Sequence, residues 1–162
     1  MAIDAERIRF LYRTEQGRLD RATWLKGAGA LAAAIAPFFL IWLALSPYTA
    51  HDLAKDPFFV PMTAVAYSFV LVYAFAILLV AVCYVNLSAK RFRDLGWEWP
   101  VALAGLAPLV ALIDGATRWL QPRVAEVMPI YWVWGVDAAL IGVIAWSVYE
   151  LGFKEARSPE LS

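Results

Sequence analysis

The sequence predicts an all-α integral membrane protein: a bundle of four transmembrane helices preceded by a short amphipathic helix at the membrane interface. Two observations carry this prediction. The chain of 162 residues is 62% hydrophobic, whereas soluble domains are about 45–50% apolar. The apolar residues also form four long runs, and about 20 apolar residues suffice for a helix to cross a bilayer. A soluble helical bundle does not need runs of this kind, so an integral membrane protein is the first choice.

The N-terminal segment, residues 1–24, is too charged to cross a membrane. Its apolar side chains fall close to one side of a helix: Ile3, Ile8, Leu11 and Tyr12. This pattern is typical of an amphipathic helix lying on a membrane surface, and a solvated tail is the alternative. Asp20 suits the N-cap of the first span, and Trp24 suits an interface anchor.

We expect spans at residues 25–46, 61–85, 98–119 and 128–152, within a single membrane domain that ends in a mobile polar tail, residues 153–162. The first span is rich in small residues that let another helix approach closely. These residues predict a helix-packing face: Gly27, Gly29 and Ala33. The second span contains no charge, and its helix is able to continue into the basic residues that follow.

The third apolar run is short and admits two interpretations. A re-entrant segment is one, and a tilted span whose outer end carries Asp114 and Arg118 is the other. The span is favoured because Pro100 suits the first turn of a helix and because residues four apart are able to pair on one helix face.

Charge is distributed unequally between the two sides of such a bundle. Of the 14 Lys and Arg residues, three lie on the side of the first and third loops: Lys55, Arg118 and Arg123. The other eleven lie on the side of the two termini and the middle loop. Because short cytoplasmic loops are enriched in Lys and Arg, this bias predicts that both termini are cytoplasmic.

The composition excludes several classes of function. The only cysteine is Cys83 and the only histidine is His51, so neither a disulfide nor a metal site with the usual ligand spacing is expected. Nucleotide-binding and hydrolase motifs are absent. We therefore expect no metal, no cofactor and no catalysis. The net charge of zero also gives no reason to expect a nucleic-acid partner.

The charged stretch at residues 88–100 and the entry to the first span supply the main candidate site. Its predicted members are Arg18, Arg21, Trp24, Lys90, Arg91, Arg93, Asp94 and Trp97. One interpretation is an interfacial ion-pair cluster, in which Arg18 or Arg21 pairs with Asp94 and Asp20 pairs with Arg91. The other is a site for anionic lipid headgroups.

Asp137 is a second candidate, because it lies inside the fourth span. A charged group at such a position costs about 3 kcal/mol and marks a functional site by default. Arg118, Arg123, Tyr67 and Ser68 are its candidate partners. The alternative is that Asp137 lies near the outer interface, paired with Arg118 or with water.

Two motifs resemble those of the DUF805 family of small bacterial inner-membrane proteins. The first is Gly17-Arg18-x-x-Arg21-x-x-Trp24, and the second runs from Lys90 through Asp94 to Trp97 and Trp99. Lys90 stands where that family has arginine, and Arg93 where it has histidine. The resemblance covers about residues 10–113. It implies a location in the bacterial inner (cytoplasmic) membrane and no particular activity.

The sequence thus favours a non-catalytic protein that binds membrane lipids with anionic headgroups and other transmembrane subunits. It would be an accessory or assembly subunit of a larger complex, or a lipid-binding scaffold. A small homo-oligomeric transporter or channel that uses Asp137 is the alternative. A membrane enzyme acting on lipid headgroups would have only Asp20 or Asp94 as its catalytic base.

Overall fold

The computed structural model describes residues 5–49, 57 and 59–155, and in this part of the chain every regular element is a helix. The elements are α1 (Ala5–Tyr12), α2 (Arg21–Leu45), η1 (Ser46–Thr49), α3 (Pro61–Asp94), α4 (Pro100–Leu120), η2 (Gln121–Arg123) and α5 (Tyr131–Gly152). Helices α2 to α5 are long and apolar enough to cross a membrane. The all-α prediction is therefore confirmed, and the chain is a multi-pass membrane protein. Predictions about Ile3, His51 and residues 156–162 lie outside the described residues.

Three of the helices begin at residues that favour a helix start. Asp20 precedes α2 and accepts a hydrogen bond from the main-chain N–H of Thr23 at 3.1 Å, as an N-cap does. Proline is the first residue of both α3 and α4, where its missing N–H leaves no bond unmade. The third apolar run therefore forms one helix of 21 residues. At about 1.5 Å per residue it is about 32 Å long, which is close to the hydrocarbon thickness of a bilayer.

Helix α3 is longer than a span requires. Its 34 residues extend for about 51 Å, whereas the hydrocarbon layer is about 30 Å thick. The apolar part ends near Val85, and the helix continues without interruption through Asn86 to Asp94. Gly96, with φ +78°, then turns the chain toward α4. The predicted continuation of the second span into the basic segment is confirmed.

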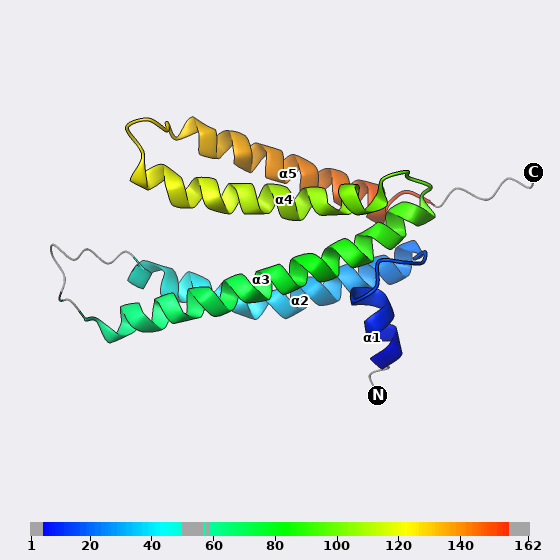
Figure 1. Ribbon diagram of the computed structural model, residues 1–162, viewed down its shortest axis with the longest axis horizontal. Coiled ribbons are helices and arrows are strands. Elements are labelled where there is room, and N and C mark those ends of the chain that lie inside the picture. Colours follow the sequence, from blue (N-terminus) through cyan, green and yellow to red (C-terminus); the bar gives the residue numbers. More distant parts are fainter. Residues whose placement is uncertain (1–4, 50–56, 58, 156–162) are drawn as a thin grey trace, which may run out of the picture.

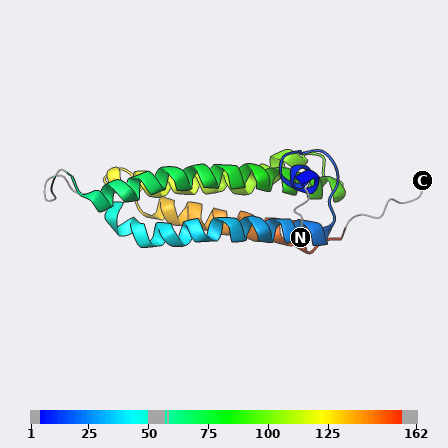
Figure 2. The same ribbon diagram turned by 90° about the horizontal axis from the view of Figure 1, so that it is seen from below.

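The four long helices form two hairpins, α2–α3 and α4–α5, which meet at one end of the molecule (Figure 1). Seen from below, α2 and α5 lie on one side and α3 and α4 on the other (Figure 2). Helix α1, the α3–α4 turn and the end of α5 are all at the end where the hairpins meet. Helix α1 runs across the direction of the long helices rather than along it.

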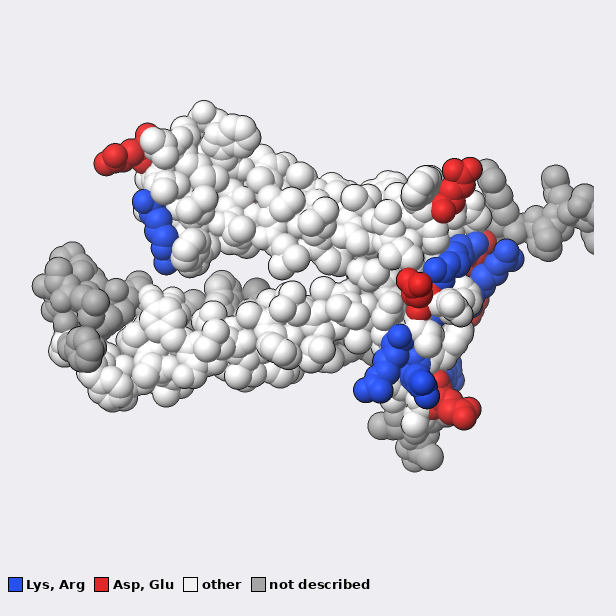
Figure 3. Space-filling model, in the orientation of Figure 1, with Lys and Arg blue, Asp and Glu red and all other residues white. Residues whose placement is uncertain are grey.

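Buried apolar residues are concentrated at that same end. The core cluster is Leu19, Trp24, Leu87, Ala89, Phe92, Leu95, Ala104 and Leu151. Toward the other end the hairpins diverge, and an open gap separates them in the space-filling view (Figure 3). In the central parts of all four spans few residues are buried within the chain, and the others are exposed or partly exposed. Such exposure is tolerable in a bilayer, because lipid tails are as apolar as the side chains they surround.

The small residues of the first span do not all pack within the chain. Gly27 is buried, and a Cβ at this position would lie 2.9 Å from Cδ1 of Leu87 on α3. No described residue of another element has an atom within 4 Å of the Cβ position of Gly29, and Ala33 is exposed. Only Gly27 therefore serves α2–α3 packing, while Gly29 and Ala33 face outward.

Candidate functional site

The last turns of α3 form the most connected polar site among the described residues. Each residue of one set near the end of α3 bonds to a residue outside α3, and we call this set the α3 hub: Asn86, Ser88, Lys90, Arg91 and Arg93. Asn86, Lys90 and Arg93 follow a spacing of four and three residues, which places them on one helix face. All three bond to carbonyls of α1 or of the segment that follows it. Ser88 and Arg91 lie three residues apart on another face and reach α2 and α5.

Arg91 joins α3 to the end of α5. Its side chain is 1% exposed. Nε donates to the Leu151 carbonyl at 3.2 Å, Nη2 donates to the Lys154 carbonyl, and Nη1 pairs with the Asp94 carboxylate. The last carbonyls of a helix lack helical partners and carry the negative end of its dipole. The planar guanidinium therefore satisfies the end of α5 and one carboxylate at once.

Lys90 joins α3 to α1 in a similar way. It is fully buried, and its Nζ donates to the carbonyl of Phe10 and, at 3.0 Å, to that of Leu11. The same Nζ lies 4.7 Å from the centre of the Phe10 ring, within the range of a cation–π interaction. Asn86 donates to the Tyr12 carbonyl at 2.8 Å. The C-terminal turn of α1 is thus bound to α3 by two side chains.

Further bonds complete this end of the molecule. Arg93 donates to the Glu15 carbonyl. The Tyr12 hydroxyl donates to the Gly27 carbonyl at 3.1 Å, and burial raises the pKa of Tyr12 above its usual value. The N-terminal segment is therefore held to α2 as well as to α3.

The two tryptophans expected at the headgroup level differ in environment. Trp24 is 3% exposed, and its indole N–H donates to the Ser88 hydroxyl at 3.2 Å. It is a core residue rather than an interface anchor, because its partner lies inside the bundle. Trp97 is 41% exposed and meets the Phe92 ring edge-on, so Trp97 alone of the two has a face open to lipid.

The ion pairs of the site are not those expected from the sequence. Asp94 pairs with Arg91 of its own helix, and Asp20 serves as the cap of α2. Arg18 and Arg21 are exposed. The hydrogen bonds from the side chain and the main chain of Thr23 hold the pKa of Asp20 below its usual value. The site is thus held together chiefly by cations on main-chain carbonyls, and Arg18 and Arg21 remain at its surface.

Glu150 lies beside the α3 hub on α5 and is 5% exposed. Its Oε1 accepts from Lys154 Nζ at 2.7 Å. Its Oε2 is buried with no hydrogen-bond partner among the described residues. Sequence reasoning missed the role of Ser88, although its spacing of three residues from Arg91 was a usable signal.

Acidic residues and one arginine meet near the other end of the molecule. Arg118 Nε lies 3.2 Å from Asp114 Oδ2, and Arg118 Nη2 lies 2.5 Å from Asp137 Oδ1. Asp137 is therefore neutralised by Arg118, one of the partners expected for it. The Arg118 side chain is 58% exposed, so this trio lies at the surface of the α4–α5 hairpin.

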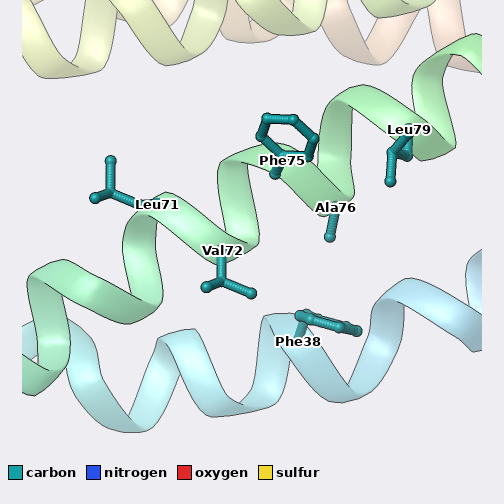
Figure 4. Close-up of a pocket in the computed structure, with 6 residues that line it drawn as sticks. All are labelled: Phe38, Leu71, Val72, Phe75, Ala76 and Leu79. Carbon is teal, nitrogen blue, oxygen red and sulfur yellow. The ribbon is translucent and has the colours of Figure 1, made fainter.

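An apolar groove of about 490 Å³ lies between α2 and α3, within the spans. Phe38 of α2 and five residues of α3 line it: Leu71, Val72, Phe75, Ala76 and Leu79. Leu71 and Phe75 point away from α2, toward the side on which α4 and α5 lie (Figure 4). The groove is thus open on the side where the hairpins diverge.

The described residues contain no group of three His, Cys, Asp or Glu residues that could hold a metal ion. The buried cations are already bonded to carbonyls and to Asp94. A search for similar proteins found no matching family model, no matching curated protein and no matching solved structure. The resemblance to the DUF805 family therefore stays a prediction.

Proposed function

We propose that this chain is a non-catalytic membrane scaffold that acts as an accessory or assembly subunit of a larger membrane complex. The observation that supports this function is the division of the molecule into a packed end and two diverging hairpins. The α3 hub and the core cluster hold the packed end together. The apolar faces beyond it are left to other membrane components.

The depth of the groove supports a transmembrane partner. Leu71 and Leu79 lie 10 and 18 residues beyond Pro61, the first residue of α3. These separations correspond to about 15 and 27 Å along the helix, so both residues lie within the thickness of a hydrocarbon layer of about 30 Å. Gly29 and Ala33, exposed on α2, allow a second helix backbone to approach closely. A transmembrane helix packs against surfaces of this kind, and lipid acyl chains are the other occupant.

The orientation follows from the charges at the packed end. The cations of the N-terminal segment, the α3 hub and Lys154 all lie at this end, and few charges interrupt the surface between the two ends on the face seen in Figure 3. The positive-inside rule favours a cytoplasmic packed end with both termini inside, in the bacterial inner membrane that the DUF805 resemblance implies. A C-terminal alkaline phosphatase fusion tests the orientation, and high phosphatase activity would contradict it.

Extraction of the full chain from its native membrane into polymer nanodiscs tests the scaffold function. We expect native mass spectrometry to find the 18.1 kDa chain together with a membrane protein in a fixed ratio. Leu71→Ala with Phe75→Ala should lower the bound fraction of that protein, because the double variant removes two side chains that line the groove. Ile141→Ala with Tyr149→Ala, on exposed parts of α5, is the matched control. A chain recovered alone, with only variable lipid in wild type and variants, would count against the proposal.

A small homo-oligomeric transporter or channel is the second candidate. It is favoured by the excess acid near the outer end, where Asp114 and Asp137 share a single arginine and Oδ1 of Asp114 is buried with no hydrogen-bond partner among the described residues. A liposome flux assay that compares wild type with Asp137→Asn tests this function. The absence of flux in both proteins would exclude it.

A further inference from the structure

Helix α1 has the position of a helix that lies in the plane of a membrane. It runs across the long helices at the level where the spans end (Figures 1 and 2). Lys90 and Asn86, which bind its last turn, follow the apolar part of α3 by only a few residues. A helix at this level and in this direction lies among lipid headgroups when α2 to α5 cross the bilayer.

The faces of α1 fit the same environment. Ile8, Leu11 and Tyr12 are three and four residues apart and share one face. Leu11 and Tyr12 pack on the core, whereas Ile8 is 43% exposed. The apolar face therefore continues beyond the protein core toward the lipid. Arg7 and Arg9 flank Ile8 at about 100° on either side, and both are exposed. An apolar stripe with basic flanks is typical of interfacial helices.

The surrounding charge is basic. Between residues 5 and 26 the cations outnumber the anions six to three: Arg7, Arg9, Arg13, Arg18, Arg21 and Lys26 against Glu6, Glu15 and Asp20. All six cations are exposed, unlike Lys90 and Arg91, which are buried. Arg13 directly follows the last residue of α1, and its main-chain N–H donates to the Arg9 carbonyl at 3.0 Å. It therefore lies next to Tyr12, whose carbonyl Asn86 binds at the end of the apolar part of α3.

We propose that α1 is an in-plane membrane helix that inserts Ile8 beside the span ends and binds anionic phospholipid headgroups through Arg7, Arg9 and Arg13. The inference rests on the proposed function, since it takes the chain as a membrane scaffold and names the ligand of one of its surfaces. The α3 hub contributes to this placement of α1. By holding the carbonyls of α1, Lys90 and Asn86 keep the three arginines at the headgroup level.

The first test is a lipid titration of the purified full chain, followed by native mass spectrometry. Wild type should bind phosphatidylglycerol in preference to phosphatidylcholine. Each cation at an anionic surface strengthens binding about fivefold, so the Arg7→Gln/Arg9→Gln/Arg13→Gln variant should bind phosphatidylglycerol about 100-fold more weakly. The corresponding triple lysine variant should retain most of the affinity, and Arg123→Gln, at the other end, should equal wild type. Unchanged preference in the triple glutamine variant, or no preference in wild type, would overturn the proposal.

The second test leaves all three arginines in place. A spin label at Ile8→Cys in a Cys83→Ser background reports the depth of α1 in vesicles of phosphatidylglycerol and phosphatidylcholine. We expect more collisions with oxygen than with a water-soluble nickel complex, and the reverse for a label at Gln16→Cys, in the exposed loop. Equal water exposure at both positions would overturn the in-plane placement. Both tests use the isolated chain, so they succeed or fail independently of the search for a partner subunit.

Discussion

Replacing Arg91 with alanine tests whether the α3 hub holds the packed end together. The side chain is 1% exposed and bonds to the Leu151 carbonyl, the Lys154 carbonyl and Asp94. Arg91→Ala removes all of its donors at once. Two carbonyls near the end of α5 and one carboxylate then lose their partner in a region that excludes most water.

The size of the effect follows from these contacts. A hydrogen bond to a charged group contributes about 1.5–3 kcal/mol, and breaking a buried ion pair costs about 3–5 kcal/mol. Two features reduce the sum of these free-energy costs. Asp94 is 20% exposed and regains some hydration, and polar bonds in membrane proteins average only about 0.6 kcal/mol because the unfolded state finds other partners. We expect a loss of about 3 kcal/mol in the free energy of unfolding.

The assay is thermal unfolding in mild detergent, followed by tryptophan fluorescence. For a chain of this length, a loss of about 3 kcal/mol lowers Tm by about 6–12 °C. Asp94→Ala should lower Tm by less, because Arg91 keeps both carbonyls. Arg21→Ala, at an exposed position of the same end, should change Tm by less than about 2 °C, as surface substitutions do. Equal Tm values for Arg91→Ala and Arg21→Ala would refute the structural role of the hub.

Three further predictions concern other parts of the fold. Gly27→Val should destabilise the protein by about 1–3 kcal/mol through overpacking against Leu87, and adding Leu87→Ala should restore part of the lost stability. Gly29→Val, with open space around it, should change Tm little. An equal loss of stability at both glycines would contradict the assigned packing. Asp20→Ala should cost about 1 kcal/mol at pH 7 by removing the α2 cap. The folded state lowers the pKa of Asp20, so the stability difference between wild type and variant should reach its full size above the unfolded pKa of about 4 and shrink as the pH falls through the folded pKa. Unfolding curves at pH 7 and pH 3 measure this difference, and a difference that grows in acid would refute the assigned cap. Arg118→Gln should lower the yield of folded protein more than Asp137→Asn. The first variant leaves Asp114 and Asp137 together without a cation, whereas the second keeps the Asp114–Arg118 pair. The yields of folded protein from membranes test this order, and the reverse order would exclude the ion-pair arrangement.

Several features of the fold could be predicted because their causes are local. Asp20 caps α2, and Pro61 and Pro100 begin α3 and α4, since each residue acts within its own turn. The pairing of Arg118 with Asp114 follows from their spacing of four residues on one helix. Ion pairs between different helices were harder to predict, because several cations and carboxylates were expected at the same end of the bundle. Of these, Asp94 pairs with Arg91, three residues earlier on its own helix.

The sequence by itself determined that this chain is a helical membrane protein with four spans and a charged end that carries a short amphipathic helix. Hydrophobic run length and helical periodicity are sufficient for these conclusions, because the bilayer sets the length of a span. Only the tertiary structure decided which groups the cations bind. Lys90 and Arg91 reach main-chain carbonyls of α1 and of the end of α5. Every residue has a main-chain carbonyl, so the sequence does not indicate which carbonyls a cation will bind. That choice depends on which helix ends are brought together in space.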